Sequence, residues 1–268
     1  MLMTLAEGLR IRQHEVGHRP HRRWTPNHRA STGPKAVQSW QPDVVVHVVG
    51  SFAAPIVAAV MRVPNVCVGF GSLVVPERMV DASDAVTSLW VENGLDPRPW
   101  GGCYDDLYVD IYPPSLRSGP SDHVPYQQSM RPVTFSTEVW SDGLDEDGVA
   151  ELGAAEGRPV IYLTFGTVFN ATGPFREAFL GLVDLDVRLV VTVGPQGDPK
   201  DFGALPSHVS VERYVPQRLL LPRCSLVVSH GGSGTFLGAL DHALPQLAYP
   251  KQPINSPTRM LARPPVRA

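Results

Sequence analysis

Short apolar runs alternate with longer stretches of helical spacing along the second half of the chain. Buried parallel strands are nearly continuous in apolar residues, whereas helices repeat their apolar positions every three to four residues. The pattern therefore predicts an alternation of strands and helices, with a short packed segment at 219–221. Strands are expected at 160–165, 188–193, 209–215, 226–228 and 246–249, and helices at 174–185 and 236–244.

The first half shows the same alternation from residue 41 onward. It predicts strands at 44–49, 66–70 and 108–112 and helices at 53–61 and 80–93. The run at 44–49 is rich in β-branched residues, which is typical of a strand covered on both faces. Apolar residues at helical spacing also predict an amphipathic helix over residues 1–12. Together these elements indicate an α/β fold.

Two segments interrupt the alternation. Residues 17–37 are basic, polar and almost free of aliphatic side chains, which predicts an irregular linker. The alternative is an anion-binding arm, because arginines are interleaved with Trp24. Fewer aliphatic residues between 120 and 158 place a domain boundary near residue 140, with an acidic and possibly helical stretch at 142–156. We therefore expect two domains, 1–140 and 141–268.

Composition excludes several classes of function. The chain has 268 residues, 43% of them hydrophobic, and a formal net charge of −3, so nothing in its charge favours nucleic acid or an anionic membrane as a partner. Its three cysteines lack metal-ligand spacing, which predicts a reduced, cytoplasmic protein without a metal site. No apolar run is long enough to span a membrane, and the first residues lack the pattern of a signal peptide.

The stretch with the clearest chemistry is His230-Gly-Gly-Ser-Gly-Thr235, which lies between a predicted strand and a predicted helix. A glycine-rich turn of this kind leaves backbone amides accessible at a helix N-terminus, where the helix dipole also attracts anions. Ser233 and Thr235 add hydroxyl donors. The segment therefore predicts a phosphate site, and the alternative is a tight turn that serves packing alone.

Other polar residues follow predicted strands. Gly166 and Thr167 come directly after the strand at 160–165, and ligands collect at this end of strands in open parallel sheets. His47 lies inside a strand, where a histidine is more often part of the core than a catalyst.

Several motifs together resemble a known family. They are Thr-Phe-Gly-Thr at 164–167, Tyr-Val-Pro-Gln at 214–217, Ser-His-Gly-Gly-Ser-Gly-Thr at 229–235 and Leu-Pro-Gln at 244–246, with Trp-Gln-Pro-Asp at 40–43, Phe-Ala-Ala-Pro at 52–55 and Asp-Ile-Tyr-Pro-Pro at 110–114. In this order they resemble the nucleotide-sugar-dependent glycosyltransferases of family 1. The actinobacterial type that glycosylates macrolides and other natural products, as in erythromycin biosynthesis, is the most similar.

The resemblance implies the GT-B fold, in which two Rossmann-like domains face a cleft. Residues 1–140 would hold the acceptor and 141–268 the activated sugar. The residues implied to bind the donor are Thr167, Tyr214, Val215, Gln217, His230, Gly231, Gly232, Ser233, Gly234, Thr235 and Gln252.

The implied roles differ between these residues. Residues 231–235 would hold the pyrophosphate, and His230 would hydrogen-bond a phosphate oxygen. Thr167 would lie on the other side of the phosphates. Tyr214 and Val215 would meet the nucleobase, and Gln217 would reach the nucleoside. Each assignment has a structural alternative: a strand-end histidine for His230, a core aromatic for Tyr214, and turn closure for Thr167 and Gln217.

The implied reaction is sugar transfer with inversion to a hydroxyl of a small acceptor. The nucleotide sugar is a co-substrate, and neither a cofactor nor a metal is implied. Family members usually take the acceptor's proton with a histidine after the first strand, for which this sequence offers no match, so the catalytic residue stays unassigned.

The sequence also departs from the family pattern at its ends. It is expected to begin inside the first helix and to lack the family's last helices. Pro250-Lys251-Gln252 replaces the expected sugar-binding motif, so Gln252 is either its surviving glutamine or a loop residue. We therefore expect weak activity or none. The alternatives are a non-catalytic protein that binds nucleotide sugar or aglycone, and an NAD-type oxidoreductase suggested by Gly232-x-Gly234. The sugar, nucleobase, acceptor and oligomeric state are not predicted.

Overall fold

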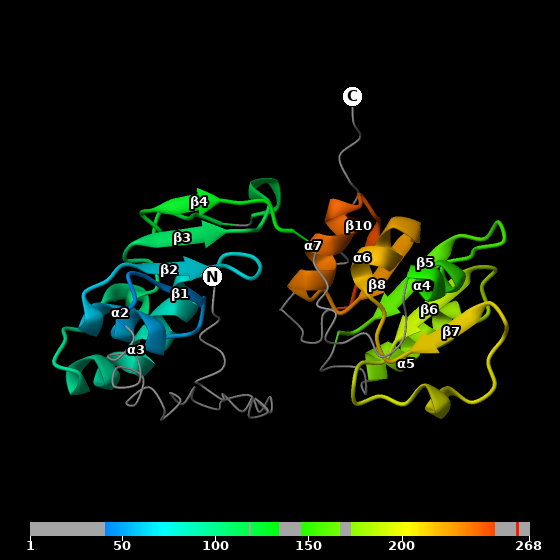
Figure 1. Ribbon diagram of the computed structural model, residues 1–268, viewed down its shortest axis with the longest axis horizontal. Coiled ribbons are helices and arrows are strands. Elements are labelled where there is room, and N and C mark those ends of the chain that lie inside the picture. The colour runs from blue at the N-terminus through cyan, green and yellow to red at the C-terminus, as the bar shows by residue number, and fades with distance from the viewer. Residues whose placement is uncertain (1–40, 118, 134–145, 167–172, 250–260, 263–268) are drawn as a thin grey trace. The chain divides into compact units, whose positions relative to one another are not determined.

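The structure is a computed structural model that describes residues 41–117, 119–133, 146–166, 173–249 and 261–262. The helix predicted over 1–12, the linker over 17–37 and the domain boundary near residue 140 lie outside these residues. The described chain forms two β-sheets (Figure 1). It groups into two compact units, 41–66 with 74–106 and 67–73 with 107–262, and the division runs through one strand of the first sheet.

The first sheet has four strands in the order β1-β2-β3-β4, and β3 and β4 run parallel. Its strands are β1 (Val45–Val48), β2 (Asn65–Val68), β3 (Leu107–Asp110) and β4 (Gln127–Ser129). The helices between them are α2 (Ala53–Met61), α3 (Pro76–Glu92) and the 3-10 turns η2 (Pro99–Gly102) and η3 (Pro114–Leu116).

These elements confirm most of the predicted pattern. Helix α2 covers the predicted residues 53–61. Helix α3 begins four residues before the predicted start, because Pro76 occupies its first turn, where a missing amide hydrogen costs nothing. Strand β4 was not predicted, since its sequence Gln-Gln-Ser has no apolar residue.

The prediction that the first strand is covered on both faces is wrong. Val45 and His47 are buried, at 2% and 8% exposure, whereas Val46 and Val48 are 43% and 49% exposed. On the buried face, Val45 packs on Val57 and Ala58 of α2. One face of β1 therefore lies in the core, and the other remains open.

A buried carboxylate anchors the end of β3. Asp110 is 1% exposed and accepts hydrogen bonds from the Tyr112 amide at 2.9 Å and from Gln127 Nε2 at 2.8 Å. It also pairs with the guanidinium of Arg117, whose side chain is 16% exposed. Three donors thus stabilise one charge inside the protein, and they join β3 to β4 and to the turn that follows β3.

The second sheet has six strands in the order β10-β9-β8-β5-β6-β7. Its strands are β5 (Val160–Thr164), β6 (Arg188–Thr192), β7 (Val209–Glu212), β8 (Leu226–Ser229), β9 (Gln246–Ala248) and β10 (Leu261–Ala262). The helices are α4 (Glu146–Leu152), α5 (Gly173–Leu182), α6 (Gln217–Leu220), α7 (Ser233–Asp241), η5 (Pro199–Phe202) and η6 (Leu221–Arg223). The strands predicted from apolar runs are all present.

Strands β5 to β9 run parallel, and β10 pairs antiparallel with β9. Side chains of β5 alternate between two cores: Tyr162 packs with residues of α4, α6 and α7, and Leu163 packs with residues of α5. Helices therefore cover both faces of the sheet, which explains why β5 is buried along its whole length.

The strand order reverses next to β5. From β5 the chain proceeds to β6 and β7 on one side, and then to β8 and β9 on the other. Helices that leave neighbouring strands toward opposite faces open a crevice at this point, outside the carboxyl ends of the strands. The reversal places the residues after β5 and β8 beside each other. Within the described part of the chain, every helix is too short or too polar to span a lipid bilayer.

Candidate functional site

The glycine-rich turn lies at the carboxyl end of β8, next to β5. Gly231 adopts φ +79°, a conformation that favours glycine, and its amide donates to Ser229 Oγ at 3.1 Å. Gly232 then caps helix α7, and its carbonyl accepts from the Phe236 amide at 2.9 Å. The turn therefore ends at Gly232, and α7 begins at Ser233.

Three amides in the first turn of α7 remain available. The backbone N–H groups of Ser233, Gly234 and Thr235 have no protein acceptor among the described residues, as expected at a helix start. A methyl group built on Gly234 would meet no atom within 4 Å. The amide of Gly231, in contrast, is already bonded to protein. The predicted contact of residues 231–235 with a diphosphate stays a prediction.

His230 fills the space between two glycines. A Cβ on Gly166 would lie 2.9 Å from His230 Cε1, and one on Gly232 would lie 2.5 Å from His230 Nε2. The imidazole also lies near the ring of Phe165, with centroids 6.2 Å apart. This close approach requires glycine at both positions and fixes the imidazole between them. Its predicted bond to a phosphate oxygen stays a prediction.

Three hydroxyl groups lie buried beneath the turn. Thr192 Oγ1 donates to Thr164 Oγ1 at 2.7 Å and lies 3.1 Å from the Tyr162 hydroxyl. The Gly166 amide donates to Thr164 Oγ1 at 3.3 Å. Burial raises the pKa of Tyr162, so its hydroxyl stays protonated and can donate. The hydroxyl cluster of Tyr162, Thr164 and Thr192 thus ties β5 and β6 to the turn after β5.

Gln217 connects the hydroxyl cluster to helix α7. Its Nε2 donates to Thr235 Oγ1 at 3.0 Å and to the Tyr162 hydroxyl at 3.5 Å. Thr235 is buried at 7% exposure. The side-chain nitrogen of Gln217 is therefore engaged with protein, and its predicted contact with a nucleoside stays a prediction.

A cavity opens at the same edge of the second sheet. The residues of that sheet and its connections that line it include Tyr162, Thr164, Gly166, Thr192, Gly194, Arg213, Tyr214, Val215, Gln217, Gly234, Leu237 and Gly238. Tyr214 is half-buried and lines the cavity, whereas Val215 is 1% exposed and belongs to the core. This placement is compatible with a planar ligand that packs beside the Tyr214 ring. It is also compatible with a contact between the ligand and the backbone atoms of Val215.

The structure brings together nine of the residues predicted to bind the donor. Thr167 and Gln252 lie outside the described residues. The hydroxyl cluster was not predicted. The sequence did contain a signal for this cluster, because Tyr162, Thr164 and Thr192 carry hydroxyl groups within apolar strand runs. A hydroxyl group that is buried in a strand needs a hydrogen-bond partner.

The comparisons with known proteins bear on the family and the fold. Residues 177–257 match the family model described as erythromycin biosynthesis protein CIII-like, C-terminal domain. The elloramycin glycosyltransferase ElmGT of Streptomyces olivaceus is 33% identical over 222 residues, which are 81% of this chain and 53% of ElmGT. The chain therefore spans about half the length of this curated relative.

Solved structures show the same fold. The glycosyltransferase SnogD from Streptomyces nogalater has a TM-score of 0.68 and 28% identity, and the match covers 84% of this chain and 60% of SnogD. The glycosyltransferase VinC in complex with dTDP has a TM-score of 0.63 and 23% identity, with 82% and 56% covered. The fold is thus that of the GT-B glycosyltransferases. The predicted resemblance to the glycosyltransferases of natural-product pathways is confirmed.

A carboxyl group near the cavity allows a test by pH. Burial raises the pKa of Glu212, the last residue of β7. The folded protein therefore binds this proton more tightly than the unfolded chain, and stability falls as the pH rises from about 4.5 through the raised pKa. Glu212→Gln lacks this carboxyl group. Its free energy of unfolding, measured with urea, is therefore expected to rise relative to that of the native protein as the pH increases over this range. Parallel stability curves for the two proteins would contradict the expectation.

Proposed function

We propose that the chain belongs to an inverting glycosyltransferase that transfers a sugar from a nucleoside diphosphate sugar to a hydroxyl of a small natural-product acceptor. The observation that carries the proposal is the start of α7, where the amides of Ser233, Gly234 and Thr235 have no protein acceptor among the described residues and Gly234 lines the cavity. Such a group of amides binds the charged oxygens of a diphosphate. VinC, which shares the fold, was solved with dTDP.

The residues at the start of α7 and around it would have different roles in the proposed reaction. The amides of Ser233, Gly234 and Thr235 would hold the diphosphate, and the positive end of α7 would stabilise the charge that grows on it as the sugar leaves. His230, fixed between Gly166 and Gly232, would add a hydrogen bond to the same phosphate. Tyr214 would lie along the base. The acceptor hydroxyl attacks the anomeric carbon, the bond to the diphosphate breaks, and a base that stays unassigned takes the hydroxyl proton.

The natural partners would be a nucleotide sugar and a hydroxylated small molecule. A reducing compartment such as the cytoplasm would suit the three cysteines, none of which is in a disulfide. The oxidoreductase alternative gains no support from the relatives described above.

Calorimetric titration of the purified chain with dTDP, UDP and NAD tests the proposal. We expect saturable binding of at least one nucleoside diphosphate and none of NAD. Turnover with a panel of nucleotide sugars and polyketide acceptors would establish transfer. Diphosphate binding without turnover would favour the non-catalytic binding protein, and failure to bind any nucleoside diphosphate would remove the basis of both.

A further inference from the structure

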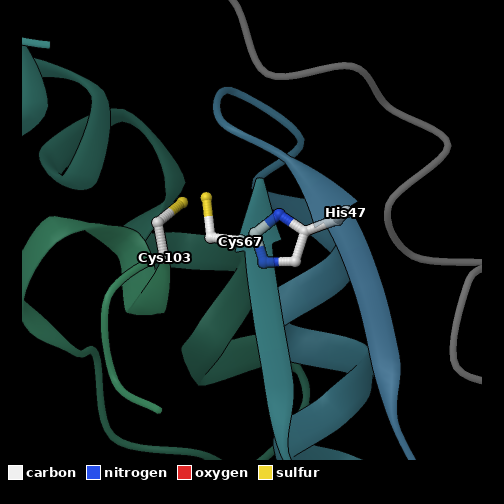
Figure 2. Close-up of side chains that lie close together, drawn as sticks. All are labelled: His47, Cys67 and Cys103. Carbon is white, nitrogen blue, oxygen red and sulfur yellow. The ribbon is translucent and has the colours of Figure 1, made fainter. Parts of the chain in front are cut away.

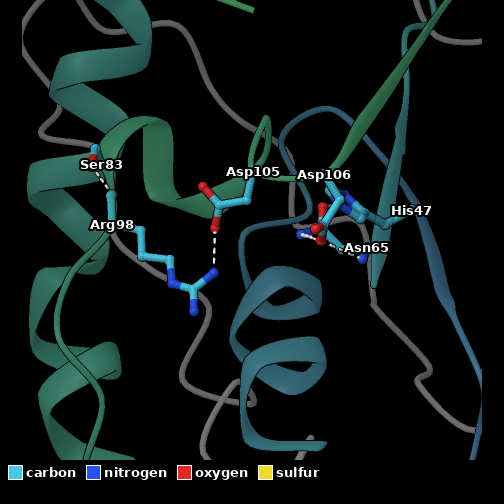
Figure 3. Close-up of polar contacts among 6 residues, drawn as sticks. All are labelled: His47, Asn65, Ser83, Arg98, Asp105 and Asp106. Atoms are coloured by element: carbon cyan, nitrogen blue, oxygen red, sulfur yellow. Dashed lines mark hydrogen bonds and ion pairs between the residues drawn. The ribbon is translucent and has the colours of Figure 1, made fainter. Parts of the chain in front are cut away.

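The buried polar groups of the first sheet are enclosed by protein. The thiols of Cys67 and Cys103, drawn with His47 in Figure 2, are both 0% exposed. His47 is 8% exposed, and its Nε2 lies 3.3 Å from Asn65 Oδ1. Asn65 in turn donates from Nδ2 to Asp106 at 3.1 Å (Figure 3). The thiols and the imidazole are therefore largely closed to solvent, whereas the hydroxyl cluster of the second sheet lines a cavity.

The hydroxyl cluster of Tyr162, Thr164 and Thr192 lies at the carboxyl ends of β5 and β6. Thr164 and Thr192 are the last residues of their strands and are directly paired in the sheet. Tyr162 stands two residues before Thr164, so both side chains point to the same face of β5. The three residues are at most 5% exposed, yet all of them line the cavity.

The hydrogen bonds within the cluster run in one direction. Thr192 Oγ1 donates its proton to Thr164 Oγ1 at 2.7 Å. A hydroxyl group has a single proton, so the hydrogen bond of 3.1 Å between Thr192 and Tyr162 uses the proton of Tyr162. The oxygen of Tyr162 can then only accept from its next neighbour, which is Gln217 Nε2 at 3.5 Å.

This direction determines how the amide group of Gln217 is turned. Nε2 carries two protons, and it donates them to the Tyr162 hydroxyl and, at 3.0 Å, to Thr235 Oγ1. The reversed amide would place Oε1 opposite the Tyr162 hydroxyl, whose only proton is already bonded to Thr192. The cluster therefore fixes the side chain of Gln217 in one orientation.

Thr235 carries the chain of hydrogen bonds into α7. It is the third residue of this helix and is 7% exposed. Its hydroxyl oxygen accepts from Gln217, while its backbone N–H is one of the three that have no protein acceptor among the described residues. Side-chain hydrogen bonds thus connect the end of β6 with the first turn of α7.

From this geometry we propose that Tyr162, Thr164 and Thr192 are positioning residues for nucleoside diphosphate binding. Through Gln217 and Thr235 they fix the first turn of α7 in the orientation in which its amides hold the diphosphate. Donors that are already oriented bind an anion more tightly, because they need no reordering when it arrives. This inference rests on the proposed function and adds residues that act on the diphosphate without touching it.

Two substitutions of Thr192 separate positioning from packing. Thr192→Val keeps the branched shape and removes the hydroxyl, whereas Thr192→Ser keeps the hydroxyl and removes a buried methyl group. Both are expected to lower stability, since one leaves the Tyr162 hydroxyl without its acceptor and the other leaves a small cavity. Only Thr192→Val is expected to weaken the binding of dTDP or UDP, by about fivefold, the usual effect of one lost hydrogen bond.

Calorimetric titration well below the thermal midpoints measures the binding of the folded variants. Thr192→Ser should bind as the native chain does. The control for the exchange of threonine for valine is Thr87→Val on α3, where an exposed hydroxyl donates to the Ser83 carbonyl oxygen at 3.2 Å. Equal binding by Thr192→Val and the native chain, or an equal loss in Thr192→Val and Thr192→Ser, would overturn the positioning role.

A double variant tests whether the hydroxyl groups act through one chain of hydrogen bonds. Tyr162→Phe removes the next hydroxyl and keeps the ring, so it is expected to weaken binding about as much as Thr192→Val. Groups in one network are not additive, and the double variant should therefore bind no more weakly than either single variant. Losses that multiply in the double variant would contradict a common chain.

A measurement on the native chain covers the case in which the variants fail to fold. Nuclear magnetic resonance of the ¹⁵N-labelled protein is expected to show slow solvent exchange of the two Nε2 protons of Gln217. The exposed Gln196 provides the comparison. Equally fast exchange at both glutamines would show that the cluster does not hold Gln217.

The outcomes also separate this inference from the proposed function. Native nucleotide binding that all the cluster variants retain would remove the positioning role and leave the proposed function standing. A native chain that binds no nucleoside diphosphate would remove the proposed function, and the positioning role with it.

Discussion

Replacing Asp110 with alanine is expected to lower the free energy of unfolding by about 3–5 kcal/mol. The substitution removes the carboxylate that pairs with Arg117 and leaves that guanidinium, 16% exposed, without its counter-charge. Breaking a buried ion pair from one side costs this much because the remaining charge keeps its desolvation penalty. The Gln127 amide and the Tyr112 N–H lose their acceptor as well. Urea unfolding with linear extrapolation measures the change.

The control for this prediction is Asp122→Ala, which removes an exposed carboxylate from the same part of the chain. Surface substitutions of this type usually change stability by about 0.5 kcal/mol or less. Equal effects of the two substitutions would show that the carboxylate of Asp110 does not anchor the end of β3. A loss in Asp110→Asn close to that in Asp110→Ala would identify the negative charge as the essential feature.

Gly234→Ala is expected to weaken nucleoside diphosphate binding at least tenfold while leaving the fold intact. The added methyl would meet no protein atom within 4 Å, so the folded chain has no reason to resist it. Gly234 nevertheless lines the cavity, at the turn whose amides we propose to hold the diphosphate. The methyl would therefore occupy space that the phosphates need, and a tenfold loss corresponds to about 1.4 kcal/mol.

Gly181→Ala is the matched control, because a methyl there also meets no atom and the residue lies on α5, away from the cavity. Alanine favours the helix over glycine at such a site, so its stability should stay equal or rise. Calorimetric titration with dTDP and UDP compares the two variants. If Gly234→Ala binds these nucleotides as tightly as the native chain, the ligand does not lie against the start of α7.

The sequence by itself determined the order of strands and helices over most of the described chain. Apolar runs such as 160–165 and the helical spacing of 53–61 are local patterns, so the sequence alone is enough to recognise them. The glycine-rich segment 230–235 was likewise identified before its structure, because its glycines interrupt the apolar pattern between a strand and a helix. Strand β4 was missed, since its three polar residues form a strand only beside β3.

The tertiary structure decided which side chains meet. The amide of Gly231 proved to bond to protein, and Gln217 to join Thr235 with Tyr162, because these contacts depend on how α6 and α7 pack on the sheet. Residues far apart in sequence become neighbours through the order of strands in a sheet, which periodicity along one strand does not encode.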